Sequence, residues 1–153
     1  MVVLLFCGNY ANAGQQSTQF TVNGNVSATC TSVSANNVTL PGSLTSSQNG
    51  TTNLIVNCSN NLPYTIAVAS TNSWALKYVS GTDLINYTLN YTGVVPGVNA
   101  TWSGGAGTTT VTTSSMVATG TNQAYPLKVI STVPTGAVSA GSYSDAVTVY
   151  VNF

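Results

Sequence analysis

Apolar residues alternate with Thr, Ser or Asn in nearly every hydrophobic segment of this chain. One such run places Phe20, Val22, Gly24, Val26 and Ala28 on one face, with polar residues between them. A period of two is typical of half-buried β-strands, because successive side chains point to opposite sides of a sheet. No window of 11 or more residues keeps the 3.6-residue period of a helix. The pattern therefore predicts an all-β chain.

Further alternating runs follow along the chain, with turn residues such as Pro41-Gly42 and Pro96-Gly97 between them. These runs cover residues 54–58, 64–68, 74–78, 84–91, 124–133 and 143–153. Short strands separated by turns favour a β-sandwich. There is no linker long enough to divide two domains. Residues 103–123 are rich in Gly, Thr and Ser, and we expect a long hairpin or a surface excursion there.

Charge is nearly absent, and this excludes several classes of function. Among 153 residues, the charged ones are Lys77, Asp83, Lys128 and Asp145. Two lysines cannot provide the basic face of a nucleic-acid binder, so no nucleic-acid partner is expected. Two carboxylates are too few for a calcium or magnesium cage, and a zinc site lacks ligands because the chain has no His. No metal or cofactor is therefore expected.

Enzyme chemistry has few candidate residues. General acid–base catalysis usually requires a His or a pair of tuned carboxylates. Asp83 and Asp145 both lie beside turn residues, where a side chain that caps a turn or a strand end is the expected interpretation. Trp74 and Trp102 could form a sugar-binding platform, although core packing is the favoured use of both rings. The sequence therefore predicts no catalytic residues.

The N-terminal residues have the character of a secretory signal. Met1 to Phe6 are apolar, and Ala11-Asn12-Ala13 precedes Gly14 as an A-x-A cleavage pattern. No Lys or Arg precedes the apolar run, which indicates a start codon assigned too late or a truncated sequence. We expect residues 1–13 to be removed; an apolar N-terminal strand is the alternative. No stretch approaches the ~20 apolar residues of a membrane-spanning helix, so no membrane insertion is expected.

Two cysteines, Cys30 and Cys58, remain after such processing, because Cys7 leaves with the signal. An even number in an exported chain indicates one disulfide. Two free thiols or a metal pair are the alternatives.

The segment that follows the cleavage site can be interpreted in two ways. Residues 14–19 are polar, and the alternating run Phe20 to Ala28 comes directly after them. The run could be an ordinary first strand of its own sheet. It could instead pair with another chain by β-strand addition to an open sheet edge.

Several motifs carry a resemblance to a known family. They are Phe20-Thr21-Val22 leading to Cys30, Val56-Asn57-Cys58, Pro63 to Val68, Asp83 to Leu89, Thr101-Trp102, Val133-Pro134 and Ala140 to Val149. With these motifs, residues 18–153 resemble the spore coat protein U domain family, which includes the shaft pilins of archaic chaperone–usher fimbriae.

The resemblance implies an immunoglobulin-like β-sandwich, formed by residues 30–153, that lacks its last strand. A donor strand from another subunit would complete it. Residues 14–29 would be the donor segment, with Phe20, Val22, Gly24, Val26 and Ala28 as plug residues. The terminal strand, with Val147, Val149, Val151 and Phe153, would line the groove and face the chaperone.

The function that the resemblance implies is that of a structural pilus subunit. It would polymerise by donor-strand exchange into a surface fibre for adhesion and biofilm formation. Its partners would be identical subunits, a periplasmic chaperone and an outer-membrane usher. It would be secreted through the periplasm to an extracellular fimbria. The alternatives are a spore or cell coat protein with a self-completed sandwich, and a carbohydrate-binding module.

Overall fold

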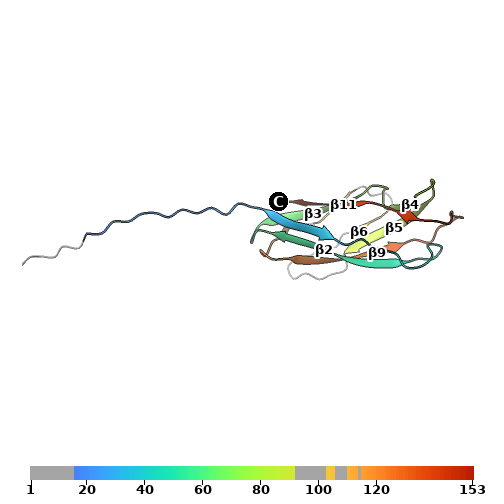
Figure 1. Cartoon of the computed structure of the whole chain (residues 1–153), viewed down its shortest axis with the longest axis horizontal. Helices are drawn as coiled ribbons and strands as arrows, with labels where there is room; N and C mark the ends of the chain where they lie inside the picture. Colours follow the sequence, from blue (N-terminus) through green and yellow to red (C-terminus); the bar gives the residue numbers. More distant parts are fainter. Residues whose placement is uncertain (1–15, 92–102, 106–109, 114) are drawn as a thin grey trace, which may run out of the picture.

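The computed structural model describes residues 16–91, 103–105, 110–113 and 115–153, and these form a β-sandwich with an extended N-terminal tail (Figure 1). The strands are β1 (Cys30–Ala35), β2 (Asn49–Cys58), β3 (Pro63–Ser70), β4 (Ala75–Tyr78), β5 (Leu84–Tyr91), β6 (Ser103–Gly104), β7 (Thr110–Thr112), β8 (Met116–Val117), β9 (Gln123–Ser131), β10 (Tyr143–Ser144) and β11 (Val147–Asn152). No helix occurs in the described ranges, as the period of two predicts.

Two antiparallel sheets make up the sandwich. The larger sheet has the order β1-β2-β9-β5-β4-β10, with β6 paired to β5. The smaller sheet has the order β11-β3-β7, with β8 paired to β3. This arrangement confirms the predicted all-β, immunoglobulin-like sandwich.

The core lies between the sheets and is built from the inward face of each alternating run. On β2 the buried residues are Leu54, Val56 and Cys58, and on β3 the alternating set Tyr64, Ile66 and Val68 is buried together with Ala67. The corresponding faces of β5 and β9 contribute Ile85, Tyr87, Leu89, Tyr91, Tyr125 and Leu127. Because each run buries every second side chain, a shift of one residue in register would expose the whole apolar set.

The C-terminal run differs from its prediction as one continuous strand. Tyr143 and Ser144 pair with β4 in the larger sheet, whereas Val147 to Asn152 pair with β3 in the smaller sheet. The chain crosses between the sheets at Asp145 and Ala146. The period of two continues through the crossing, so the alternation alone does not reveal it.

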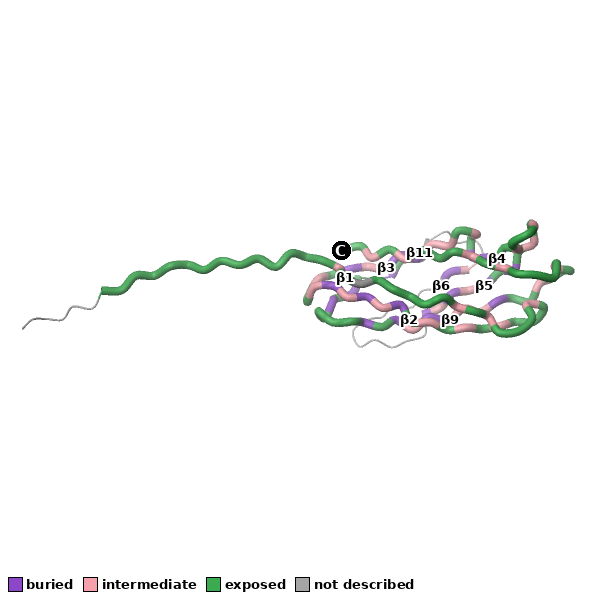
Figure 2. Tube along the Cα trace, in the orientation of Figure 1, coloured by how far each residue is buried: buried purple, intermediate pink, exposed green. Residues whose placement is uncertain are grey.

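The first alternating run does not pair with the sandwich. Residues 16–29 form an extended, exposed tail that leaves the domain beside the C-terminus (Figures 1 and 2). The side chains of Phe20, Val22 and Val26 are 85%, 83% and 89% exposed. The tail therefore does not complete its own sheet, as a self-completed coat protein would require.

Candidate functional site: an open groove and an unpaired strand

The outer edges of two strands remain unpaired on one side of the sandwich. Within the described part of the chain, β1 hydrogen-bonds to β2 alone, and β11 hydrogen-bonds to β3 alone. The two strands belong to different sheets and approach each other without pairing. Their free N–H and C=O groups can accept one more strand between them.

A groove runs along this open edge and comprises two adjoining cavities. The narrower cavity, of about 180 Å³, lies between residues 35–40 and the side chains of Val147 and Val149. Core residues from both sheets form its floor: Val68, Leu76, Tyr87, Leu89, Leu127 and Val129. Val68, Leu89 and Leu127 at the base of this cavity are buried, whereas Val147 on its wall is exposed, so a further strand would cover the wall. We call this whole feature the open-edge groove.

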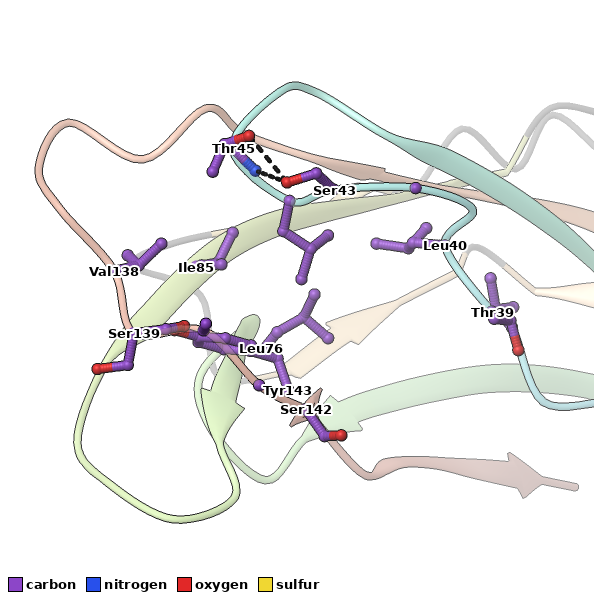
Figure 3. A pocket seen from close by; sticks show the side chains of 15 residues that line it. Thr39, Leu40, Ser43, Thr45, Leu76, Ile85, Val138, Ser139, Ser142 and Tyr143 are labelled. Atoms are coloured by element: carbon purple, nitrogen blue, oxygen red, sulfur yellow. Dashed lines mark hydrogen bonds between the residues drawn. The ribbon is translucent and has the colours of Figure 1, made fainter.

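The second cavity widens the open-edge groove at the end farther from the C-terminus. It has a volume of about 600 Å³, and residues 38–45 and 138–143 form its two walls. Figure 3 shows Leu40 and Leu76 pointing into the space between these walls, with Ser43, Ser139 and Ser142 near its rim. The two cavities share Val38, Leu40 and Leu76, which makes them parts of one groove.

Part of one face of the terminal strand lies along the open-edge groove. Val147 and Val149 line the narrower cavity, and Val149 and Val151 pack against the core. Phe153, at the end of the chain, is exposed. Val147 is also exposed, although it lies in phase with Val149 and Val151. The exposure of an inward-facing valine follows from the missing neighbour on this side of β11.

The root of the tail is fastened to the domain. The predicted disulfide between Cys30 and Cys58 is present, and it joins the first residue of β1 to the last residue of β2. Beside it, the Thr29 N–H donates to Ser59 Oγ at 3.1 Å, and the Ser59 N–H donates to the Thr29 carbonyl at 2.8 Å. These contacts fix the point from which the tail extends.

The narrower cavity also contains a carboxylate, that of Asp145. Its Oδ2 accepts hydrogen bonds from Tyr87 OH at 2.6 Å and from Ser70 Oγ at 2.5 Å, and its Oδ1 accepts one from the Asn72 N–H at 3.0 Å. Burial, together with the hydrogen bond and negative charge of Asp145, raises the pKa of Tyr87. The Tyr87 hydroxyl therefore stays protonated and acts as a donor.

The interpretation of Asp145 as a capping residue was incomplete, because its carboxylate links groups from both sheets. The sequence contains a signal for this role, since Asp145 lies in phase with Val147 and Val149 on the inward face. Asp83 lies directly before β5, and its Oδ2 accepts the Ser139 N–H at 2.7 Å, a contact with a segment 56 residues away in the chain.

The other sequence candidates give no binding site. Trp74 is fully buried in the core, which excludes it as an exposed platform for sugars, and Trp102 lies outside the described residues. In the described ranges, no group of three or more His, Cys, Asp or Glu residues could hold a metal ion. A search of those same ranges also finds no helix that is long and apolar enough to cross a membrane.

Comparison with known proteins identifies a domain family and a related fold. The family model of the spore coat protein U domain matches residues 16–150. Among solved structures, a chain of the CsuC–CsuE chaperone–tip adhesion subunit pre-assembly complex, from archaic chaperone–usher Csu pili of Acinetobacter baumannii, is similar with a TM-score of 0.55 and 22% identity. The alignment covers 84% of the present chain but 40% of that one, and at this identity it shows the fold alone. Comparison with curated proteins gives no match.

Proposed function

Because the chain belongs to the spore coat protein U domain family, we propose that it is the structural subunit of an archaic chaperone–usher pilus. Subunits polymerise by donor-strand exchange: the tail of one subunit fills the open-edge groove of the next. The resulting surface fibre serves adhesion and biofilm formation outside the cell, after secretion through the periplasm. The observation that carries this proposal is that one chain has both an open-edge groove and an exposed tail. Apolar residues of the tail alternate with polar ones, as in a strand that buries one face.

The tail and the open-edge groove are complementary in chemistry. Phe20, Val22 and Val26 form an exposed apolar face on the tail, and the floor of the groove is apolar. Full burial of one Phe and two Val side chains contributes roughly 5–9 kcal/mol before any hydrogen bond of the strand is counted. Gly24 lies at the centre of this face, and the absence of a side chain there lets the donor backbone approach the narrow cavity closely.

The dimensions also agree. Residues 20–28, fully extended, reach about 30 Å, which is long enough to cross a small domain. The tail leaves its domain at the end where β11 finishes, and β4 lies at the opposite end (Figure 1). The wider cavity is at this opposite end, because Leu76 of β4 lines it. In a head-to-tail fibre, the tail of one subunit enters its neighbour at the wide end. It then runs antiparallel to β11, with Phe20 reaching toward Phe153. Ala28 lies at the entrance of the groove, close to the disulfide at Cys30 of its own domain.

Assembly also requires the groove to be covered before the subunits meet. A periplasmic chaperone supplies a temporary strand along Val147, Val149, Val151 and Phe153, and an outer-membrane usher exchanges it for the next tail. The similar solved structure is itself described as a chaperone–subunit pre-assembly complex, which supports a chaperone as a partner. Membership of the family and the open edge of the sandwich support two further partners, identical subunits and an outer-membrane usher.

The test is deletion of residues 16–25 in the full chain, expressed with its chaperone and usher. Wild-type fibres should run as a ladder on an unboiled denaturing gel and appear by electron microscopy, whereas the deletion variant should give monomers alone. A matched control replaces Thr21, Asn23 and Asn25 by Ser, which leaves the apolar face intact and should preserve the ladder. Normal fibres from the deletion variant would show that this segment is not the donor strand.

A further inference from the structure

Asp145 lies where the chain passes from one sheet to the other at the open edge. The residues before it pair with β4 in the larger sheet, and those after it pair with β3 in the smaller sheet. Tyr87, its partner at 2.6 Å, belongs to β5 in the larger sheet, and Ser70, its partner at 2.5 Å, is the last residue of β3 in the smaller sheet. A single carboxylate oxygen therefore joins the two layers.

The same contacts organise the turn between β3 and β4. Ser70 Oγ accepts the Trp74 N–H at 2.6 Å, and Asp145 Oδ1 accepts the Asn72 N–H. Ser73 and Trp74 have φ angles of 54° and 65°, a left-handed conformation that is costly for residues other than glycine. The buried Trp74 ring then packs edge-on against Tyr87, with ring centroids 5.9 Å apart. Asp145, Ser70 and Tyr87 therefore connect the turn between β3 and β4, the core at Trp74 and the open-edge groove.

An empty groove creates a physical difficulty at this edge. Val147 on its wall is exposed and Val149 is half-buried, so closing the two sheets over the groove would remove apolar surface from water and be favourable. A closed groove could not receive a strand. The hydrogen bonds of Asp145 oppose closure, because hydrogen bonds to a charged acceptor are short, directional and roughly twice as strong as neutral ones.

We propose that Asp145, together with Tyr87 and Ser70, is a brace that keeps the two sheets apart at the open-edge groove until a donor strand enters. The inference rests on the proposed function, since it assigns a role in strand uptake. Asp145 is a positioning residue: it acts on the spacing of the sheets, and the donor strand itself holds that spacing once the groove is filled.

This role makes a kinetic prediction that a general stabilising contact does not make. Loss of the brace lowers the fraction of empty domains that are open, and apparent affinity falls in proportion to that fraction. The filled state is unaffected, so the association rate of the donor strand falls while its dissociation rate stays unchanged. A drop of the open fraction to about one tenth gives an about tenfold slower association.

The first experiment measures binding of a fluorescent peptide with the sequence of residues 16–29 to the full-chain protein by stopped flow. The variants are Tyr87→Phe, which keeps the ring and removes the hydroxyl, and Asp145→Asn, which keeps the size and removes the charge. Tyr64→Phe, which also removes a buried tyrosine hydroxyl but outside the linings of both cavities, is the matched control. We expect association about tenfold slower for the first two, with unchanged dissociation and unchanged kinetics for the control. An unchanged association rate of the peptide with the Tyr87→Phe and Asp145→Asn variants overturns the brace. Faster dissociation from these variants overturns it too, because it would indicate that Tyr87 or Asp145 contacts the donor strand directly.

The second experiment tests the brace without a donor strand. Spin labels at Asn37→Cys and Thr148→Cys, in a Cys7→Ser background, report the distance across the groove in the full chain. Both positions are exposed: Asn37 lines the narrower cavity, and Thr148 lies between Val147 and Val149, which form the opposite wall. Tyr87→Phe should shorten and broaden the distance distribution, and an unchanged distribution refutes the brace. If the wild type fails to bind the peptide, the proposed function fails, while this distance still decides whether the brace exists.

Discussion

Replacing Phe20 by Ser separates the stability of the monomer from that of the polymer. In the isolated chain the Phe20 side chain is almost fully solvated, so the thermal midpoint of the monomer should change little. If Phe20 is a plug residue as proposed, the same ring is buried in a filled groove, and its loss removes about 1.5–3 kcal/mol of transfer free energy. Since about 1.4 kcal/mol corresponds to a factor of ten, the dissociation constant of the donor strand should rise about 10- to 150-fold.

The assay compares two synthetic peptides of residues 16–29, one with the wild-type sequence and one carrying Phe20→Ser, by competition for the same full-chain protein. In parallel, the Phe20→Ser chain is assembled, and its ladder on unboiled gels is followed as the sample is heated. Thr21→Ser, on the opposite face of the tail, is the matched control and should behave as the wild type. Equal affinities for the two peptides would refute the assignment of Phe20 as a plug residue, and so would a Phe20→Ser monomer that melts much earlier than the wild type.

Three further predictions concern the tail, the disulfide and the buried tyrosines. A Cβ at Gly24 would have no atom within 4 Å, so Gly24→Leu should leave the thermal midpoint of the monomer unchanged. The same substitution should abolish the polymer ladder, and a full ladder would contradict a close approach of the donor backbone at Gly24 to the groove. Replacing Cys30 and Cys58 by Ser opens a link with a sequence separation of 28 and should reduce the free energy of unfolding, measured in urea, by roughly 3–4 kcal/mol; an unchanged value would show that the disulfide does not constrain the unfolded chain. Burial raises the pKa values of Tyr64, Tyr87 and Tyr125 above 10.0, so the stability that these neutral hydroxyls provide is present below about pH 10 and lost as pH rises further. Urea midpoints between about pH 8 and 11 should fall at the alkaline end, as the tyrosines of the unfolded chain ionise, and a flat profile would contradict the linkage.

The inward faces of the central strands were predictable because their chemistry is local. Leu54 and Val56 on β2, and Ile66 and Val68 on β3, are spaced two residues apart and all four are buried, although Ala67 between the last two is buried as well. The Cys30–Cys58 link was predictable as well, because exported chains rarely keep two free thiols. The buried faces depend on side chains that are near one another in sequence, and the disulfide depends on the pairing of two cysteines.

Other features depend on tertiary contacts that no local pattern contains. The crossing at Asp145 leaves the alternation intact, so the sequence does not distinguish one long strand from β10 and β11 in separate sheets. The donors to Asp145 come from Ser70 and Tyr87, which are 75 and 58 residues away in the chain. Residues 20–28 have the pattern of an ordinary strand, and the absence of a partner in the described part of the same domain is a property of the whole fold.

The position of the disulfide has a mechanical consequence. It connects the first residue of β1 to the last residue of β2, directly after the tail and next to the hydrogen bonds between Thr29 and Ser59. A pulling force applied to the tail therefore reaches a covalent bond before it reaches the remaining pairs between β1 and β2. The tension passes into β2, a central strand that pairs with β9 along eight residue pairs. As a result, the pulling force does not separate β1 from β2 starting at Cys30. The domain is thus reinforced at the root of its tail, one of the two places where the proposed fibre under load would pull on it; the other is the open-edge groove.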